Sequence, residues 1–176
     1  SKLPEKEIRK LQETLRQFWD IASGLRRKRM SGGSLDLDMP ETKIFVDKDG
    51  WADRIEKIEN DESHQLIEEY MLLANEELAK LLRTKNIPGI FRVHDNPDEE
   101  KLNDRRKTLD QWGIKVGDLT KRTEVTKALT AIKKQHQSHM LSIEFLRSLA
   151  KACYRASPDG HYGLNKGDYT HFTAPI

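Results

Sequence analysis

The stretch ESHQLIEEYMLLANEELAKLLRT, residues 62–84, constrains the fold more than any other part of the sequence. Apolar residues recur along it every three or four positions, which is the spacing of an amphipathic helix. Asn60 or Asp61 provides an N-cap. Such a helix must bury its apolar side, so it predicts a core element. The expected buried face comprises Ile67, Tyr70, Met71, Ala74, Leu78, Leu81 and Leu82.

Four more segments carry a helical pattern. They are a first segment near the N-terminus and residues 97–112, 123–135 and 139–156. Pro4, followed by acidic residues, starts the first of them, and the basic cluster 26–29 ends it, which suits the helix dipole. The last is expected to end at Ser157-Pro158-Asp159-Gly160, to place Cys153 beside its core side and to bury Leu141, Phe145, Leu149 and Ala152.

Short strands are expected in two places. TKIFVD and WADRIEKIE flank Asp49-Gly50, a favourable hairpin turn. PGIFRVHD indicates a further short strand after a Pro-Gly turn. The predicted fold class is therefore α+β, mainly helical, with a short antiparallel hairpin, and residues 1–176 form a single domain.

Composition limits the environment of the chain. Its 176 residues are 36% hydrophobic and 34% charged, and no apolar run is long enough to span a bilayer. The N-terminus is charged rather than that of a signal peptide, and Cys153 has no second cysteine to pair with. We expect a soluble, cytoplasmic protein with no membrane partner and no disulfide.

Charge is distributed unevenly along the sequence. Residues 1–30 carry nine Lys or Arg against four Asp or Glu, residues 36–69 carry four against twelve, and residues 101–155 carry thirteen against five. Basic blocks of this kind attract polyanions, although each block can also be an ordinary solvated surface. If the helix 139–156 forms, Arg147, Lys151 and Arg155 lie four apart on one face, where they either border the path of a polyanion or form plain surface.

Familiar catalytic motifs are missing. The sequence holds no P-loop, GxGxxG, GxSxG or CxxC pattern. His136 and His139 lie in a polar connector and are weak candidates for zinc. Asp36, Asp38 and Glu41 are weak candidates for calcium because no glycine turn accompanies them.

One acidic residue of the helix 62–84 is unusual. Glu62, Glu69 and Glu76 recur every seven residues and predict a solvated face, to which Glu68 does not belong. Glu68 and Asn75 lie instead at the edge of the predicted buried surface. A half-buried carboxylate is costly unless something bonds it. Glu68 therefore makes either a structural hydrogen bond or a ligand contact.

Five segments follow one another along the chain: LRRKRMSGGSLDLDMPETKI, SHQLIEEYMLLANEELA, PGIFRVHDNPDEEKL, LDQWGI and GHYGLNKGDYTHFTAPI. Together and in this order they resemble the RNB exoribonucleases, the ribonuclease II and ribonuclease R family. The resemblance covers nearly the whole chain and is weakest at 115–138. It implies the C-terminal portion of an RNB catalytic domain, truncated at both ends. The family's Mg²⁺-binding aspartates are expected before Ser1 and its phosphate-contacting arginine after Ile176, so no catalytic or metal residue is expected in this chain.

The resemblance also implies substrate contacts. The first Glu of the family's acidic pair approaches the ribose near the RNA 3′ end, and Glu68 matches it. Leu37 matches an aromatic residue that stacks on a base, so that contact would be a weaker apolar one here. Tyr169 and Thr173, with His161 and His171, would line the channel or simply pack.

The implied activity is that of a 3′–5′ exoribonuclease with Mg²⁺ as its cofactor. Such an enzyme hydrolyses single-stranded RNA processively to nucleoside 5′-monophosphates, and the RNA-decay machinery is a further expected partner. The alternative is a non-catalytic RNA-binding protein that has lost the metal-binding aspartates. On the first interpretation the intact parent is active and the isolated 176 residues are not.

Overall fold

A computed structural model describes residues 4–35, 41–58 and 60–173. Within these residues the chain forms five helices and four strands, and the strands pair as two small antiparallel sheets, β1–β2 and β3–β4. The elements are α1 (Glu5–Ser31), β1 (Glu41–Val46), β2 (Ala52–Ile58), α2 (Glu62–Thr84), β3 (Phe91–Val93), α3 (Glu99–Gln111), α4 (Arg122–Lys133), α5 (Ser138–Ser148) and β4 (Cys153–Arg155). The mainly helical α+β class is confirmed. In the part of the chain that is described, no helix has the length and apolar character needed to cross a membrane.

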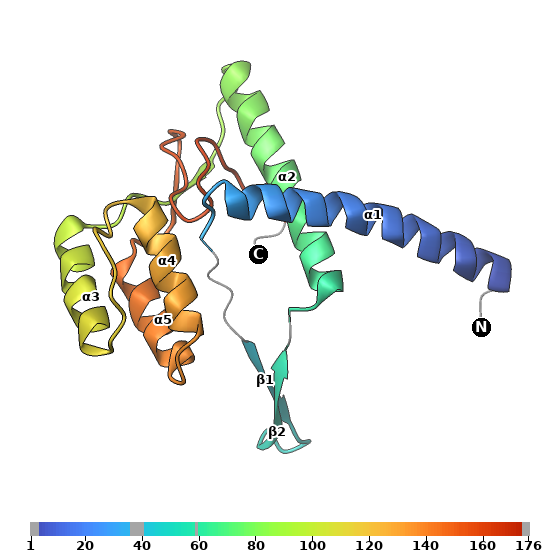
Figure 1. The fold of residues 1–176 in the computed structure, drawn as a ribbon. Helices are drawn as coiled ribbons and strands as arrows, with labels where there is room; N and C mark the ends of the chain where they lie inside the picture. The colour runs from blue at the N-terminus through green and yellow to red at the C-terminus, as the bar shows by residue number, and fades with distance from the viewer. Residues whose placement is uncertain (1–3, 36–40, 59, 174–176) are drawn as a thin grey trace.

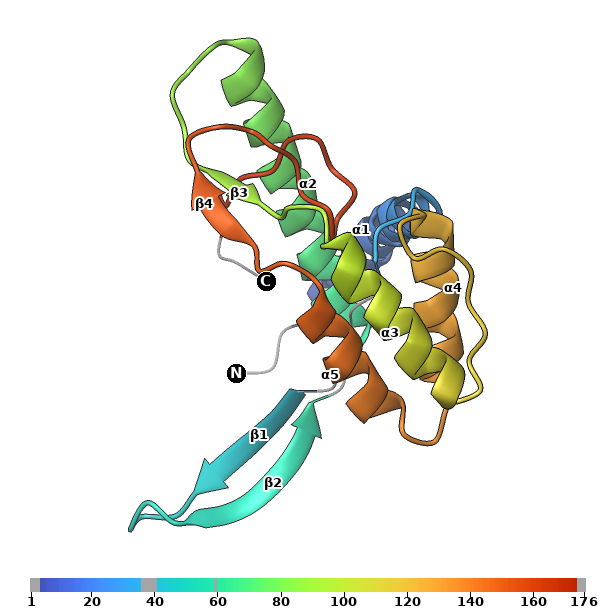
Figure 2. The same ribbon diagram turned by 90° about the vertical axis from the view of Figure 1, so that its left-hand side faces the viewer.

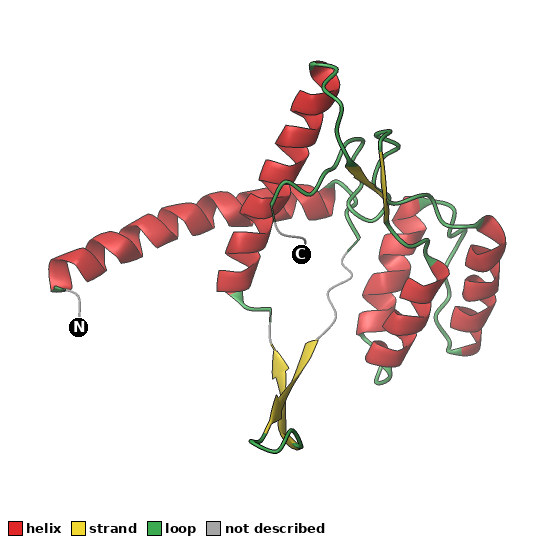
Figure 3. Cartoon of the chain, turned by 180° about the vertical axis from the view of Figure 1, so that it is seen from behind, coloured by secondary structure: helices red, strands yellow, loops and turns green. Residues whose placement is uncertain are grey.

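Helices α3, α4 and α5 pack into a three-helix unit at one side of the molecule (Figures 1 and 3). Its interior is apolar because each helix turns one aliphatic stripe inward. Leu141, Phe145 and Leu149 are buried there, as the sequence predicts. The other buried members of this core are Leu35, Leu102, Leu109, Ile114, Leu119, Val125, Ala128, Leu129 and Ile132.

Helix α1 crosses α2, and its N-terminal part projects beyond the body of the molecule (Figure 1). Ala22 is fully buried, whereas the apolar stripe toward the N-terminus is largely exposed. Near the crossing, the rings of Phe18 and Tyr70 meet edge to face at 5.8 Å. The Tyr70 hydroxyl also donates to the Phe18 carbonyl oxygen at 3.2 Å. The crossing is thus fixed by specific contacts near the C-terminal half of α1.

Strands β1 and β2 form the predicted hairpin, which extends away from the helices (Figure 2). Ile44 pairs with Ile55 in the register of the two strands. The turn is closed by Asp47, whose carboxylate accepts the backbone N–H groups of Asp49 and Trp51 at 2.9 Å each. Gly50 has φ +85°, a conformation that favours glycine.

Two expectations about helices were wrong. The helix expected at 139–156 ends at Ser148, and the chain turns extended at Leu149 to form β4. The chain is extended here because residues 153–155 pair with β3, with Cys153 opposite Val93. A helix at these residues would leave β3 without its partner strand. Cys153 therefore packs with β3 and α2 rather than beside a helix core. In α2, Ile67 and Leu81 are exposed and the other five expected residues are half-buried, whereas the buried residues are Glu69, Asn75 and Ala79.

Candidate functional site

The N-terminus of α2 is set by Asp61. Its carboxylate accepts the backbone N–H groups of Ser63 and His64 at 3.0 Å each, as an N-cap should. The hydrogen bond from the Ser63 hydroxyl, followed by those from His64, lowers the pKa of Asp61 well below its usual range. This cap fixes where the helix begins and thus which way its acidic pair, Glu68 and Glu69, faces.

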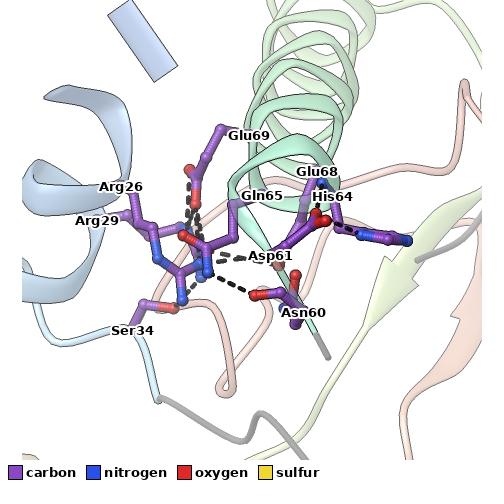
Figure 4. Close-up of polar contacts among 9 residues, drawn as sticks. All are labelled: Arg26, Arg29, Ser34, Asn60, Asp61, His64, Gln65, Glu68 and Glu69. Carbon is purple, nitrogen blue, oxygen red and sulfur yellow. Dashed lines mark hydrogen bonds and ion pairs between the residues drawn. The ribbon is translucent and has the colours of Figure 1, made fainter. Parts of the chain in front are cut away.

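Glu69 makes a buried ion pair with Arg29 of α1 (Figure 4). Arg29 Nε lies 3.2 Å from both carboxylate oxygens of Glu69, and Arg29 Nη2 contacts Oε1 as well. Arg29 Nη1 also donates to the buried Ser34 hydroxyl at 3.2 Å. The Glu69 side chain is 2% exposed and that of Arg29 9%. The expectation that Glu69 lies on a solvated face is therefore wrong, because α1 covers that face.

Glu68 lies at the rim of the same cluster. Its carboxylate is 3.6 Å from Arg29 Nη2 and 3.7 Å from Arg26 Nη1, longer than hydrogen bonds, and its side chain is 22% exposed. We call Arg26, Arg29, Glu68 and Glu69 the Arg–Glu cluster (Figure 4). Glu69 makes its close contacts with Arg29 and is almost fully buried, whereas Glu68 makes longer ion pairs and is more exposed.

Asn75 joins α2 to the segment 169–173. It is fully buried, and its Nδ2 donates to the Tyr169 hydroxyl at 3.1 Å. Its Oδ1 accepts the backbone N–H groups of Phe172 and Thr173 at 2.9 and 2.8 Å, and the Thr173 hydroxyl at 3.1 Å. Two of the predicted site residues, Tyr169 and Thr173, are thus brought to the helix that carries Glu68.

A row of rings runs beside this segment. Tyr169 lies edge to face with His161 at 5.4 Å and with His171 at 5.6 Å. His171 Nδ1 is 2.7 Å from the Tyr154 hydroxyl. Burial, reinforced by the nearby His94, lowers the pKa of His161 to about 4. Burial also raises the pKa of Tyr169 against the opposing effect of the Asn75 hydrogen bond. His161 is therefore neutral at physiological pH.

The loop after α1 is tied to the C-terminal segment by Arg122, a residue that sequence reasoning missed. Arg122 donates to the carbonyl oxygens of Gly33 and Tyr162, and its guanidinium lies 4.6 Å from the Tyr162 ring centroid. Leu35 N–H donates to the Gly163 carbonyl at 2.8 Å. No local pattern distinguishes Arg122 from the other basic residues of 101–155, so the sequence offered no signal for it.

A groove of about 470 Å³ lies between α1, α2 and residues 164–169. Glu69 and Tyr169 both line it. At its edge Glu76 pairs with Lys166 at 2.6 Å and with Lys80 at 2.9 Å. Burial acts to raise the pKa of Glu76, but the hydrogen bonds from these two lysines outweigh it and lower that pKa. The groove therefore has an ion-paired rim on one side and the Arg–Glu cluster on the other.

Other predicted site residues do not lie at the groove or the Arg–Glu cluster. Leu37, with Asp36 and Asp38, lies outside the described residues. Arg147 and Arg155 do not share a helix face, because Arg147 is in α5 and Arg155 is in β4. Arg155 Nη2 instead pairs with Asp95 at 2.5 Å. Across residues 4–35, 41–58 and 60–173, no group of three or more His, Cys, Asp or Glu could hold a metal ion.

The whole chain, residues 1–176, matches the RNB domain model, and the chain belongs to this family. It is 34% identical over 174 residues to ribonuclease R of Aquifex aeolicus (strain VF5), which covers 98% of this chain and 25% of that protein. The fold matches the apo form of Mycoplasma genitalium RNase R with a TM-score of 0.87 at 28% identity, covering 100% of this chain and 28% of that one. The same protein in complex with ribose-methylated single-stranded RNA matches with a TM-score of 0.87 at 29% identity and the same coverage. The chain spans about a quarter of the length of these relatives. The predicted family is confirmed.

Proposed function

We propose that this chain is part of a 3′–5′ exoribonuclease acting processively on single-stranded RNA, and that Glu68 contacts the ribose near the RNA 3′ end. The observation that carries the proposal is the unequal environment of the acidic pair. Glu69 makes a buried ion pair with Arg29, whereas the side chain of Glu68, beside the same arginine, is 22% exposed. Membership of the RNB family supports the substrate class.

The proposed contact distinguishes RNA from DNA. A ribose 2′-OH can donate a hydrogen bond to a carboxylate, and a deoxyribose has no group to take its place. Arg26 and Arg29 lie 3.7 and 3.6 Å from the Glu68 carboxylate and favour its position at the rim of the cluster, where it is proposed to accept a charge-assisted hydrogen bond. Loss of a hydrogen bond to a charged group costs about 1.5–3 kcal/mol.

Three further residues belong to the proposed RNA-binding surface. Tyr169 and Thr173 are held to α2 through Asn75, and the Tyr169 side chain lines the groove beside Glu69. Leu37 is proposed to make an apolar contact with a base. Each of these contacts is proposed to help bind the 3′ end of the RNA rather than to cleave a bond.

Mg²⁺ would supply metal-activated water and charge stabilisation at the scissile phosphate. The described residues do not fit such a site, since they contain no cluster of three or more potential ligands. We therefore assign no metal ligand and no catalytic residue to this chain. The metal-binding aspartates and the phosphate-contacting arginine are proposed to lie outside it, and RNA-decay proteins are proposed partners of the intact enzyme.

The test compares the binding of a fluorescent single-stranded RNA with that of its 2′-deoxy counterpart at fixed salt. Glu68→Ala removes the acceptor, so it should weaken RNA binding by about tenfold or more and leave DNA binding nearly unchanged, because only RNA offers the 2′-OH. Glu62→Ala, in the exposed first turn of the same helix, is the matched control. Equal weakening on both polymers would refute a ribose contact.

A denaturing gel of 5′-labelled RNA tests the catalytic part of the proposal. We expect the full-length protein to shorten the RNA from its 3′ end in the presence of Mg²⁺, and the 176-residue chain to leave it intact. Shortening by the purified chain, abolished by a chelator, would contradict the placement of the metal ligands. Ribose-selective binding without cleavage by the full-length protein would assign it to the non-catalytic class.

A further inference from the structure

Asn75 lies two helical turns after Glu68, on the same side of α2. Its side chain is fully buried, although an amide is costly to bury unless its hydrogen bonds are satisfied. Its side-chain hydrogen bonds join it to Tyr169, Phe172 and Thr173, which lie 94 to 98 positions later in the sequence. This segment runs beside α2 (Figure 2). One side chain therefore joins two distant parts of the chain.

The bonds fix both the position and the direction of the segment. Oδ1 receives two successive backbone N–H groups, those of Phe172 and Thr173, which a carbonyl oxygen can accept together only when the backbone curls around it. On the other side of the segment, the Tyr169 carbonyl accepts the Arg92 N–H at 2.8 Å. The Thr170 hydroxyl donates to the Ile90 carbonyl at 2.5 Å. Strand β3 thus holds the start of the segment, and Asn75 holds its end.

Few other side chains could replace this amide. Leucine matches the shape of asparagine but would leave the Phe172 and Thr173 N–H groups without this acceptor. Aspartate keeps an acceptor for both N–H groups, and the Tyr169 hydroxyl could donate to it instead of accepting. The required feature is therefore the accepting oxygen at this position.

We propose that Asn75 is a positioning residue, which sets the selectivity for ribose by holding the Tyr169–Thr173 segment in register against the helix that carries Glu68. Asn75 itself does not touch the RNA. The segment and Glu68 act as one surface because the amide prevents the segment from moving independently of α2. This inference rests on the proposed ribose contact of Glu68.

The first part of the test is hydrogen exchange of single amides in the 176-residue chain. The amides of Phe172 and Thr173 should be protected in the wild type and should exchange at least tenfold faster in Asn75→Leu. The amides within α2 should stay protected. Asn75→Asp should restore protection at both positions, and Asn103→Ala, at an exposed asparagine of α3, should change nothing. Unchanged protection in Asn75→Leu would overturn the proposal.

If Asn75→Leu also exposes the amides of α2, the measurement is made on Asn75→Ser, which retains an accepting oxygen on a shorter side chain. The segment amides should then exchange faster while the α2 amides remain protected. Loss of protection in α2 and in the segment together, in both variants, would assign Asn75 to general stability and overturn a positioning role.

The second part measures the ratio of RNA to 2′-deoxy affinity for the same labelled oligonucleotides. Asn75→Leu should lower this ratio at least fivefold, and Asn75→Asp should restore most of it. A purely structural role of Asn75 would leave the ratio unchanged. A released segment with an unchanged ratio would overturn the inference while leaving the Glu68 contact standing. A wild-type chain with no preference for RNA would instead refute the proposed function, and the exchange data would still decide whether Asn75 holds the segment.

Discussion

The three-helix unit and the α1–α2 crossing are built on opposite principles. The core of the three-helix unit is aliphatic and aromatic, centred on Phe145 and Ile132, which are fully buried. The crossing and its neighbouring C-terminal segment bury polar groups instead, among them Glu69, Asn75 and Ser34. In the first region contacts are non-directional, whereas in the second each buried group has a particular partner at a particular distance.

This difference suggests that one region stabilises the fold and the other positions particular side chains. Apolar burial contributes free energy roughly in proportion to area and tolerates small shifts. Buried ion pairs contribute little net free energy, because desolvation offsets the attraction, but they are strongly destabilising when one partner is removed. We infer that the three-helix unit stabilises this part of the molecule, and that the polar region orients the proposed RNA-binding residues.

The largest expected effect is that of Phe145→Ala. Removing a fully buried ring leaves a cavity and should lower the free energy of unfolding by about 3–5 kcal/mol, measured by urea denaturation. Phe172→Ala removes the same ring from an exposed position in the polar region, and it should change stability by no more than about 0.5 kcal/mol. Similar losses for both variants would break the contrast between the two regions.

Glu69→Ala should lower the free energy of unfolding by about 3 kcal/mol, somewhat less than Phe145→Ala. This is the lower end for a broken buried ion pair, because Arg29 can turn toward Glu68. The double variant Arg29→Met/Glu69→Leu should regain most of that stability, because an apolar pair carries no desolvation cost. It should nevertheless weaken ribose selectivity, since Glu68 loses a neighbouring charge. A double variant as unstable as the single one would mean that the ion pair itself stabilises the fold.

A smaller effect concerns pH and His161. Burial lowers the pKa of His161 from its usual 6.5 to about 4, so the unfolded chain takes up this proton more readily than the folded one. Stability is unaffected by this group above pH 6.5 and decreases as the pH falls from there toward 4. His161→Asn should make urea midpoints less dependent on pH within this window.

The matched control for this pH dependence is His136→Asn, at an exposed histidine between α4 and α5. It should keep the slope of the wild type. Part of the slope should persist in His161→Asn as well, because burial also lowers the pKa of His94. An unchanged slope in His161→Asn would mean that the ring is not desolvated in solution.

Much of the local structure could be predicted because its signals are local. The bounds of α2 follow from the Asp61 cap and the apolar spacing, and the β1–β2 hairpin follows from the turn at Asp49-Gly50. The prediction went wrong at 149–156, where helical spacing continues but the chain pairs with β3. A strand of three residues depends on its partner more than on its own sequence.

The candidate site was predictable only in part. Helical geometry placed Glu68 and Asn75 on one edge of a buried surface, and both lie close to buried groups in the structure. The same geometry assigned Glu69 to solvent, although Glu69 is the more buried of the pair. A helix pattern shows which residues share a face, but it does not show which polar face another helix will cover.

The sequence by itself indicated the family, because several motifs that resemble it follow one another in the same order. It also determined the mainly helical class and most element boundaries, because these depend on spacing, caps and turns within a few residues. Tertiary structure decided which glutamate is buried and what Asn75 binds. Arg29 reaches Glu69 from 40 positions away, and Phe172 and Thr173 reach Asn75 from nearly a hundred. Buried polar groups are stable only with their partners, so their roles became defined once folding had brought those distant partners together.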